Sequence, residues 1–256
     1  MVSSQRFRML TRRGILQSWG LVVAAWQMNW LRSDAGGAQE APNRLLEAVD
    51  RVRTPEGAFV TQVTISTREP TKPEQVHGYE VYAQGARQTL VRFTSPASER
   101  GKSLLMLDQD LWMYLPTVGQ PIRIPLAQRL VGNVAHGDIA RLNFAGDYED
   151  TLLDSEVVEG QECYLLHLTA RTKTLTYGTI RLWVAKATAH PLQAEFFTLA
   201  GQLLKRGRYT QYALVAGRLR PTQLVLVDQV RTGLVSTLEY RDMQAREIPE
   251  KFFNKN

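Results

Sequence analysis

Four side chains able to bind a metal or transfer a proton lie close together in the sequence: His136, Asp138, Asp147 and Asp150. Carboxylate oxygens and imidazole nitrogens are common ligands of divalent cations, so this group is the first candidate for chemistry. Oxygen-rich loops of this kind more often form turns and helix caps. We therefore predict no metal site and no other cofactor.

The common catalytic motifs do not occur in the sequence. It has no Gly-x-Ser-x-Gly nucleophile elbow, no glycine-rich phosphate loop, no His-Glu-x-x-His and no Cys-x-x-Cys. His77, His167 and His190 stand alone in alternating segments, where a hydrogen-bonded structural role is the default. The acidic residues of 147–156 have the pattern of a solvated strand face. We predict that the chain is not an enzyme.

Composition and charge narrow the function classes further. Of 256 residues, 44% are hydrophobic and 22% charged, which is typical of a globular protein. The single cysteine, Cys163, cannot form an internal disulfide and excludes a cysteine-rich zinc or redox module. Residues 1–38 contain five basic side chains and one acidic side chain. The remaining residues contain 26 basic and 24 acidic side chains. The net charge of +6 is thus concentrated at the start, and we expect no nucleic-acid partner.

Residues 1–38 have the order of an export signal: a basic stretch, an apolar stretch and then small residues. Gly36 and Ala38 fit the small-x-small pattern that signal peptidase cleaves. Arg12-Arg13 resembles a twin-arginine signal, with the general secretory route as the alternative. Polar residues make the apolar stretch a poor membrane span, and a retained anchor is the competing interpretation. We predict a cleaved signal peptide (1–38), a mature domain (39–256) and a periplasmic location.

One helix and a series of strands are predicted after this segment. Leu45, Leu46, Val49 and Val52 recur at helical spacing, and Pro55 ends the pattern. Strands at short, regular spacing with no helices between them indicate antiparallel hairpins in a single all-β domain. The segments that alternate apolar and polar residues between turn signals are 58–68, 76–83, 88–94, 101–107, 110–115, 147–157, 161–170, 179–184, 190–199, 202–212, 219–230 and 234–241.

Residues 125–146 interrupt the alternation. Leu126, Leu130 and Val134, followed by Ile139, lie at spacings that a helix places on one side. A long connection in a small domain is usually functional or mobile. Two interpretations stay open: a short helix that plugs one end of a barrel, or a lid over a cavity.

Two of the predicted strands, 104–107 and 111–115, are apolar on both faces. Antiparallel strands normally leave one face in water, so another layer of protein or a ligand must cover the second face. Methionine side chains such as Met113 tolerate varied apolar ligands, although they are more often part of the core. Alternation alone does not show which face points inward. We predict that the residues lining an apolar cavity include Leu104, Met106, Trp112, Tyr114, Leu130, Ile139 and Phe144.

Short motifs in a fixed order carry a resemblance to a known family. Arg100-Gly101 followed by Leu111-Trp-Met-Tyr-Leu-Pro116 resembles the "RG…LWLYLP" signature of the LolA-like outer-membrane lipoprotein-sorting proteins. One departure is that many members have Gly-Ser-Asp where this chain has His136-Gly137-Asp138. The order extends over about residues 42–253 and includes Gly146-Asp147-Tyr148, Leu182-Trp183-Val184, Pro191-Leu192 and Ile248-Pro249.

The resemblance implies an all-β fold with accessory helices: a single antiparallel, incompletely closed β-barrel with a helical lid. It also implies a monomeric periplasmic carrier that binds the acyl chains of lipids or lipoproteins, contacts membranes transiently and works beside an inner-membrane transporter. The alternative is a lipid-binding sensor or accessory subunit that regulates an envelope transporter or signalling protein. Burying a ~16-carbon chain gains on the order of 10 kcal/mol over water, nearly as much as a membrane offers. Transfer then requires no catalytic group.

Overall fold

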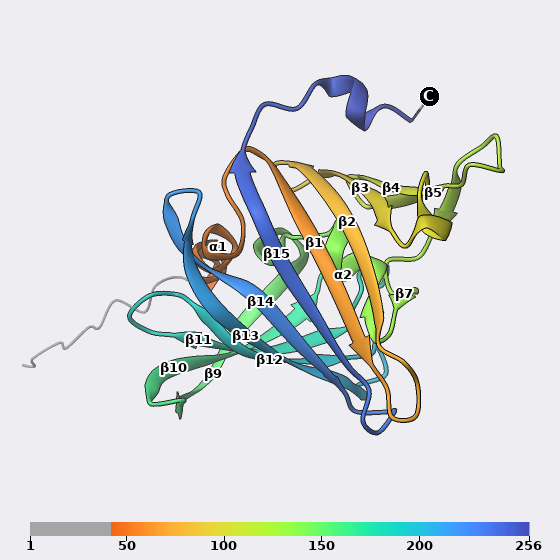
Figure 1. Ribbon diagram of the computed structural model, residues 1–256. Helices are drawn as coiled ribbons and strands as arrows, with labels where there is room; N and C mark the ends of the chain where they lie inside the picture. The colour runs from red at the N-terminus through yellow and green to blue at the C-terminus, as the bar shows by residue number, and fades with distance from the viewer. Residues whose placement is uncertain (1–41, 256) are drawn as a thin grey trace, which may run out of the picture. The chain divides into compact units, whose positions relative to one another are not determined.

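The computed structural model describes residues 42–255, and strands dominate this part of the chain (Figure 1). Each strand predicted from alternation is present, with ends that differ by only a few residues. The strands of the main sheet are β1 (Ala58–Arg68), β2 (Gln75–Gln84), β3 (Gln88–Ser95), β4 (Ser103–Leu107), β5 (Asp110–Tyr114), β6 (Ile122–Ile124), β9 (Tyr148–Val158), β10 (Gln161–Ala170), β11 (Thr179–Ala185), β12 (Pro191–Phe197), β13 (Leu203–Val215), β14 (Arg218–Asp228) and β15 (Val235–Ala245).

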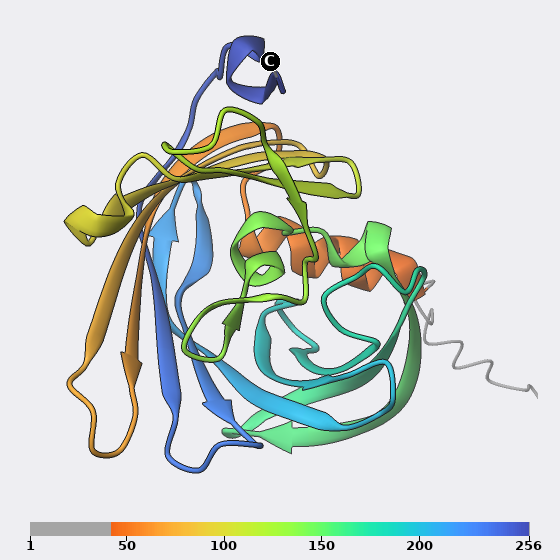
Figure 2. The same ribbon diagram turned by 90° about the vertical axis from the view of Figure 1, so that its right-hand side faces the viewer.

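These strands form one antiparallel sheet in the order β6-β5-β4-β3-β2-β1-β15-β14-β13-β12-β11-β10-β9. Neighbours in the chain pair as hairpins, and β1 pairs with the last strand, β15, from Phe59–Ala245 to Arg68–Val235. The sheet curls strongly, yet its two outer strands, β6 and β9, do not pair with each other (Figure 2). The predicted fold, an incompletely closed antiparallel barrel with accessory helices, is confirmed.

Helix α1 (Pro42–Arg53) lies inside the curl of the sheet (Figure 2). Its apolar side chains fall on one face, where Leu46 and Val49 are completely buried. The last carbonyl groups of a helix have no partner within the helix. Here the guanidinium of Arg220 on β14 donates to the carbonyl oxygens of Arg51 (2.6 Å) and Val52 (3.0 Å). The predicted helix is therefore present, and its end is anchored to the sheet.

Residues 125–147, which we call the lid, are only partly helical. The prediction of one helical face through Leu126, Leu130 and Val134 is wrong, because residues 129–135 form a hairpin that turns at Gly132. Gly132 has φ +57°, a left-handed conformation that ends any helix and suits a tight turn. The elements of the lid are β7 (Arg129–Val131), β8 (Val134–Ala135), α2 (His136–Ala140) and α3 (Phe144–Asp147).

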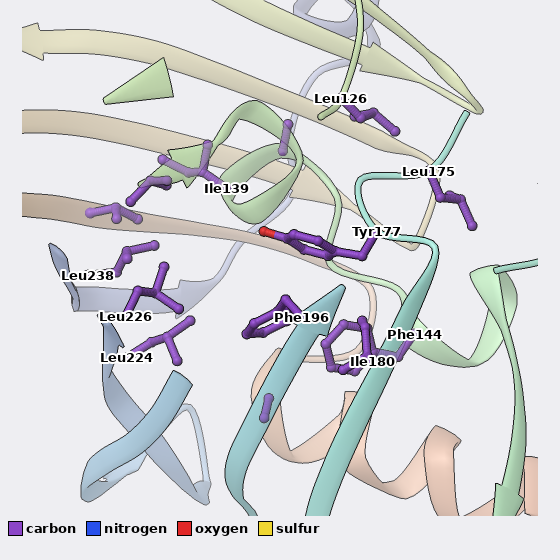
Figure 3. Close-up of a cluster of buried hydrophobic side chains, with 14 of the residues drawn as sticks. Leu126, Ile139, Phe144, Leu175, Tyr177, Ile180, Phe196, Leu224, Leu226 and Leu238 are labelled. Atoms are coloured by element: carbon purple, nitrogen blue, oxygen red, sulfur yellow. The ribbon is translucent and has the colours of Figure 1, made fainter. Parts of the chain in front are cut away.

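The main hydrophobic cluster fills the space between the concave face of the sheet, α1 and the lid. Alternate residues of the strands supply it, such as Leu224 and Leu226 of β14, and they face the same space as Ile139 of α2 (Figure 3). The concave face of the sheet thus carries the main apolar core.

A separate cluster covers the convex face of β3, β4 and β5. Leu90, Leu105 and the half-buried Trp112 contact Ile248 and Phe253 of the C-terminal segment, whose 3₁₀ helix spans Glu250–Phe253. This segment is the layer of protein that covers the second apolar face expected from the sequence.

No helix among residues 42–255 combines the length and the apolar character needed to cross a membrane. The predicted signal segment, residues 1–38, lies outside the described residues.

Candidate functional site

Two cavities lie within the curl of the sheet and share part of their lining. The larger, which we call the mouth cavity, has a volume of about 1050 Å³. It lies between strands β5 and β6, the β7–β8 hairpin, and loops near residues 171–178, 198–200 and 228–231. The smaller, which we call the inner cavity, has a volume of about 60 Å³. Sites for drug-sized ligands measure about 300–1,000 Å³, so only the mouth cavity has room for such a molecule in this conformation.

The inner cavity extends from the lid into the main hydrophobic cluster. Most of its lining is apolar, and its volume is enough for only a few water molecules. Its apolar lining includes Phe59, Val63, Val81, Ile139, Phe144, Phe196 and Leu224. An acyl chain can enter this space only if the lid or the sheet moves.

The segment Leu175–Tyr177 lines both cavities and forms the partition between them. It belongs to the loop that joins β10 to β11, and α2 packs closely against it. A Cβ atom built on Gly137 of α2 lies 3.1 Å from the Cβ atom of Thr176 and overlaps its hydroxyl group. Glycine at position 137 therefore permits this close approach. Figure 3 shows Tyr177 beside α2, with its hydroxyl group directed toward that helix.

A buried polar network joins the lid to the wall of the sheet. Asp138 of α2 accepts a hydrogen bond from the Tyr177 hydroxyl (2.5 Å) and forms an ion pair with Lys205 of β13 (2.5 Å). Lys205 also donates to the carbonyl oxygen of Asn133 (2.8 Å), and Asp138 accepts from the amide of Ala135 (2.8 Å). Burial, together with the adjacent Asp138, raises the pKa of Tyr177 well above its usual value. The network holds α2 against β13 and against the loop that joins β10 to β11.

Three further polar contacts fix the helical part of the lid. Arg141 forms a bidentate ion pair with Asp147 and donates to the carbonyl oxygen of Asp108, in the turn between β4 and β5. Asp50 of α1 accepts from the amide of Ala145 (2.8 Å). The desolvation of Asp50 on burial raises its pKa. Polar contacts therefore tie α3 both to α1 and to the sheet.

The tip of the β7–β8 hairpin is held in the same manner. Arg231 donates to the carbonyl oxygen of Gly132 (2.7 Å), and the amide group of Asn133 donates to the carbonyl oxygen of Leu226 (3.1 Å). Water can replace hydrogen bonds of this kind when a segment moves away, whereas it cannot replace apolar contacts. Polar contacts thus hold the lid at several points, and its apolar side chains Leu126, Val134 and Ile139 are buried in the main hydrophobic cluster as well.

The structure places the seven predicted cavity residues in three different settings. Ile139 and Phe144 line the inner cavity. Leu104 and Met106 are buried in the main cluster without lining either cavity, and Leu130 packs half-buried against it.

Trp112 and Tyr114 lie on the convex face instead, in the cluster formed with the C-terminal segment. The pairing of β4 with β5 gives the reason, since Trp112 lies opposite the outward Leu105 while Leu104 lies opposite Met113. Directly opposite residues share a face, so Leu111 and Met113 are the inward residues of β5.

Three of the four side chains first considered for metal binding have separate partners, while the fourth, Asp150, has a buried Oδ2 atom with no hydrogen-bond partner among the described residues. The Nδ1 atom of His136 lies 2.8 Å from the carbonyl oxygen of Gln128, whereas Asp138 pairs with Lys205 and Asp147 with Arg141. Sequence reasoning missed Lys205, although the pattern held a signal for it. Lys205 alternates with Gly207 and Tyr209 on the buried face of β13, where a lysine requires a buried partner.

Comparison with known proteins gives concordant results. A family model described only as "-like: Uncharacterized protein" matches residues 85–256. The crystal structure of a LolA superfamily protein from Nitrosomonas europaea is 42% identical in sequence, with a TM-score of 0.80, covering 84% of this chain and 97% of that one. Comparison with curated protein sequences gives no significant match.

Two more distant structures share the fold. A DUF1329 family protein from Desulfovibrio piger is 21% identical, with a TM-score of 0.73, over 84% of this chain and 96% of that one. An outer membrane lipoprotein-sorting protein domain from Vibrio parahaemolyticus is 20% identical, with a TM-score of 0.73, over 84% of this chain and 97% of that one.

Proposed function

Because the chain belongs to the LolA superfamily, we propose that it is a carrier that binds the acyl chains of a lipid or lipoprotein inside its curled sheet. The observation that carries the proposal is the apolar interior enclosed by the curled sheet, α1 and the lid. The lid contributes Ile139 and Phe144 to this interior and is also held by the polar contacts of Asp138, Arg141 and Gly132. Such an interior binds chains without selecting their exact length.

The energetics favour carriage over irreversible capture. An acyl chain gains roughly 0.8 kcal/mol for each methylene that leaves water, whether it enters a protein interior or a membrane. Transfer between the two is then nearly balanced, and the hydrogen bonds and ion pairs of the lid decide its direction. No bond in the ligand needs to break, so the proposed function requires no catalytic residue.

The carrier is proposed to act as a monomer in the periplasm, with transient contacts to membranes and to an inner-membrane transporter. The lipoprotein-sorting domain with the same fold and the signal-like pattern of residues 1–38 support this placement. The mature region would then be residues 39–256.

A reversible cross-link of the lid tests the proposal. Gly137→Cys with Thr176→Cys places two thiols where the Cβ atoms lie 3.1 Å apart, and a small shift of the loop brings them to the 3.5–4.5 Å of a disulfide. The buried Cys163 is replaced by alanine in the variant and its control to prevent disulfide exchange. The purified chain is stripped of bound lipid and mixed with a fluorescent fatty acid.

Uptake of the probe is expected to slow at least tenfold in the oxidised variant and to recover when a reductant is added. The control with only Cys163→Ala should behave identically with and without reductant. A lipid-free parent protein that binds no acyl probe would contradict the carrier function. A probe that enters the oxidised and reduced forms equally fast would show that the lid is not the gate.

A further inference from the structure

The mouth cavity has an excess of basic side chains. Its lining contains Arg123, Arg129, Lys173, Lys205 and Arg231 but only one acidic residue, Asp228. Three of the five have ion-pair partners: Lys205 pairs with Asp138, Arg231 with Asp228, and Arg123 with Asp110. Arg129 and Lys173 are exposed and make no ion pair within residues 42–255. Two cations at the entrance are thus free to bind an anion.

Apolar side chains form the deeper wall of the same cavity. Leu126 and Leu175 are buried in the main cluster and also line the mouth cavity. At the rim, Leu199 and Val230 expose 62% and 58% of their surface, although leucine and valine normally favour burial. The cavity therefore changes from an apolar wall at its inner end to exposed apolar and cationic side chains at its entrance.

We infer that the ligand is an amphiphile with an anionic phosphate headgroup, which binds at Arg129 and Lys173 while its acyl chain runs toward Leu126 and Leu175. This inference rests on the proposed carrier function and adds the chemical class of the ligand. Phosphate oxygens accept hydrogen bonds from guanidinium and ammonium groups alike, and Arg129 and Lys173 line the same cavity. The positive entrance also raises the local concentration of anionic ligands before they bind.

Two ligands that differ only in the phosphate test the inference: a 1-acylglycerol 3-phosphate and the monoacylglycerol with the same acyl chain. Both compete with a fluorescent fatty acid for the lipid-free protein, at concentrations below those at which they form micelles. The phosphate-bearing ligand is expected to bind about tenfold more tightly. The preference should shrink as salt is added, because salt screens exposed charges. Glycerol 3-phosphate without an acyl chain is the third ligand.

Paired variants assign the effect to the two side chains. Arg129→Gln with Lys173→Gln should remove most of the preference and leave the affinity for the monoacylglycerol unchanged. The matched control is Arg218→Gln with Arg246→Gln, which removes two equal charges from exposed residues outside the lining of the mouth cavity. Antiparallel pairing places both at the opposite ends of β14 and β15 from the loop around Val230. The control should retain the full preference.

The possible outcomes separate the two proposals. If neither acyl ligand binds the parent protein, the carrier function fails. If both acyl ligands bind equally well, or if the control variant loses as much preference as the Arg129 and Lys173 variant, the carrier function stands and the headgroup inference is overturned. If glycerol 3-phosphate competes as well as the acylated phosphate, the entrance is a site for soluble phosphate compounds, and the inference also fails.

Discussion

Asp138 of the lid and Lys205 of β13 form an ion pair with 2.5 Å between Oδ2 and Nζ, and only 8% and 3% of their side chains are exposed. Burying two charges costs several kcal/mol of desolvation for each, which their mutual attraction and further hydrogen bonds must offset. Tyr177, Ala135 and Asn133 supply those further hydrogen bonds. The pair therefore fixes where the lid docks, and it contributes less to net stability than its geometry suggests.

Removing only Lys205 should be strongly destabilising. Lys205→Met leaves the Asp138 carboxylate buried without its counter-ion, which we expect to lower the free energy of unfolding by about 3–5 kcal/mol. Adding Asp138→Asn removes the uncompensated charge and should recover more than half of the loss. Urea denaturation of the parent, the single variant and the double variant measures both effects. A single variant that loses less than 1 kcal/mol would contradict a docked lid.

The hairpin tip tolerates no side chain at Gly132. Gly132 has φ +57°, and a Cβ atom there would overlap the hydroxyl groups of Ser236 and Thr67. Gly160 has φ +78° with open space around its Cβ position, so Gly160→Ala tests the backbone conformation alone. Both variants should lose about 1 kcal/mol or more from left-handed strain, and Gly132→Ala should lose at least 1 kcal/mol beyond that. Equal losses would show that the tip is not packed against β1 and β15.

Acidification should lower the stability of the folded protein through protonation of His136. Burial lowers the pKa of His136 below 6.5, so the unfolded chain binds a proton more readily than the folded chain. The free energy of unfolding must then fall as the pH drops below about 6.5, by at most about 1.4 kcal/mol per pH unit for this group. His136→Asn retains a donor for the Gln128 carbonyl oxygen and should reduce the loss between pH 7.5 and 5.5. Denaturation curves at both pH values measure the change.

Part of this pH dependence should remain in the variant, because burial lowers the pKa of His190 as well. The same slope in the parent and in His136→Asn would show that His136 does not remain neutral in the folded protein.

Trp112 should affect stability without affecting ligand binding. Its ring lies against the Lys255 ammonium, 3.3 Å from the ring centroid, on the convex face of the sheet. Trp112→Ala is expected to lower the free energy of unfolding by about 1–3 kcal/mol through lost apolar contact and to change the affinity for an acyl probe less than twofold. The affinity of this variant for the acyl probe is compared with that of Ile139→Ala, which alters the lining of the inner cavity. A large loss of affinity in Trp112→Ala would place the binding site on the other face.

Strand positions were predictable because alternation is a local signal, and segments such as 58–68 and 161–170 match β1 and β10. The inward face of β5 could not be predicted in this way, because both faces of the strand are apolar. Leu111 is distinguished from Trp112 only by the pairing with β4 and by contact with the C-terminal segment. The lid was recognised as an interruption, but its hairpin depends on contacts of Gly132 and Asn133 with residues about 100 positions away. Such long-range contacts leave little trace in local spacing.

Strands β6 and β9, which end the sheet and do not pair with each other, give it an adjustable circumference. A closed barrel must break a ladder of backbone hydrogen bonds before it can widen, because every strand has two partners. Here β6 and β9 can separate without breaking any strand pairing between them, and the sheet can uncurl by small changes in twist spread over its other strands. The enclosed volume can therefore grow beyond the roughly 60 Å³ of the inner cavity without the loss of a strand pairing.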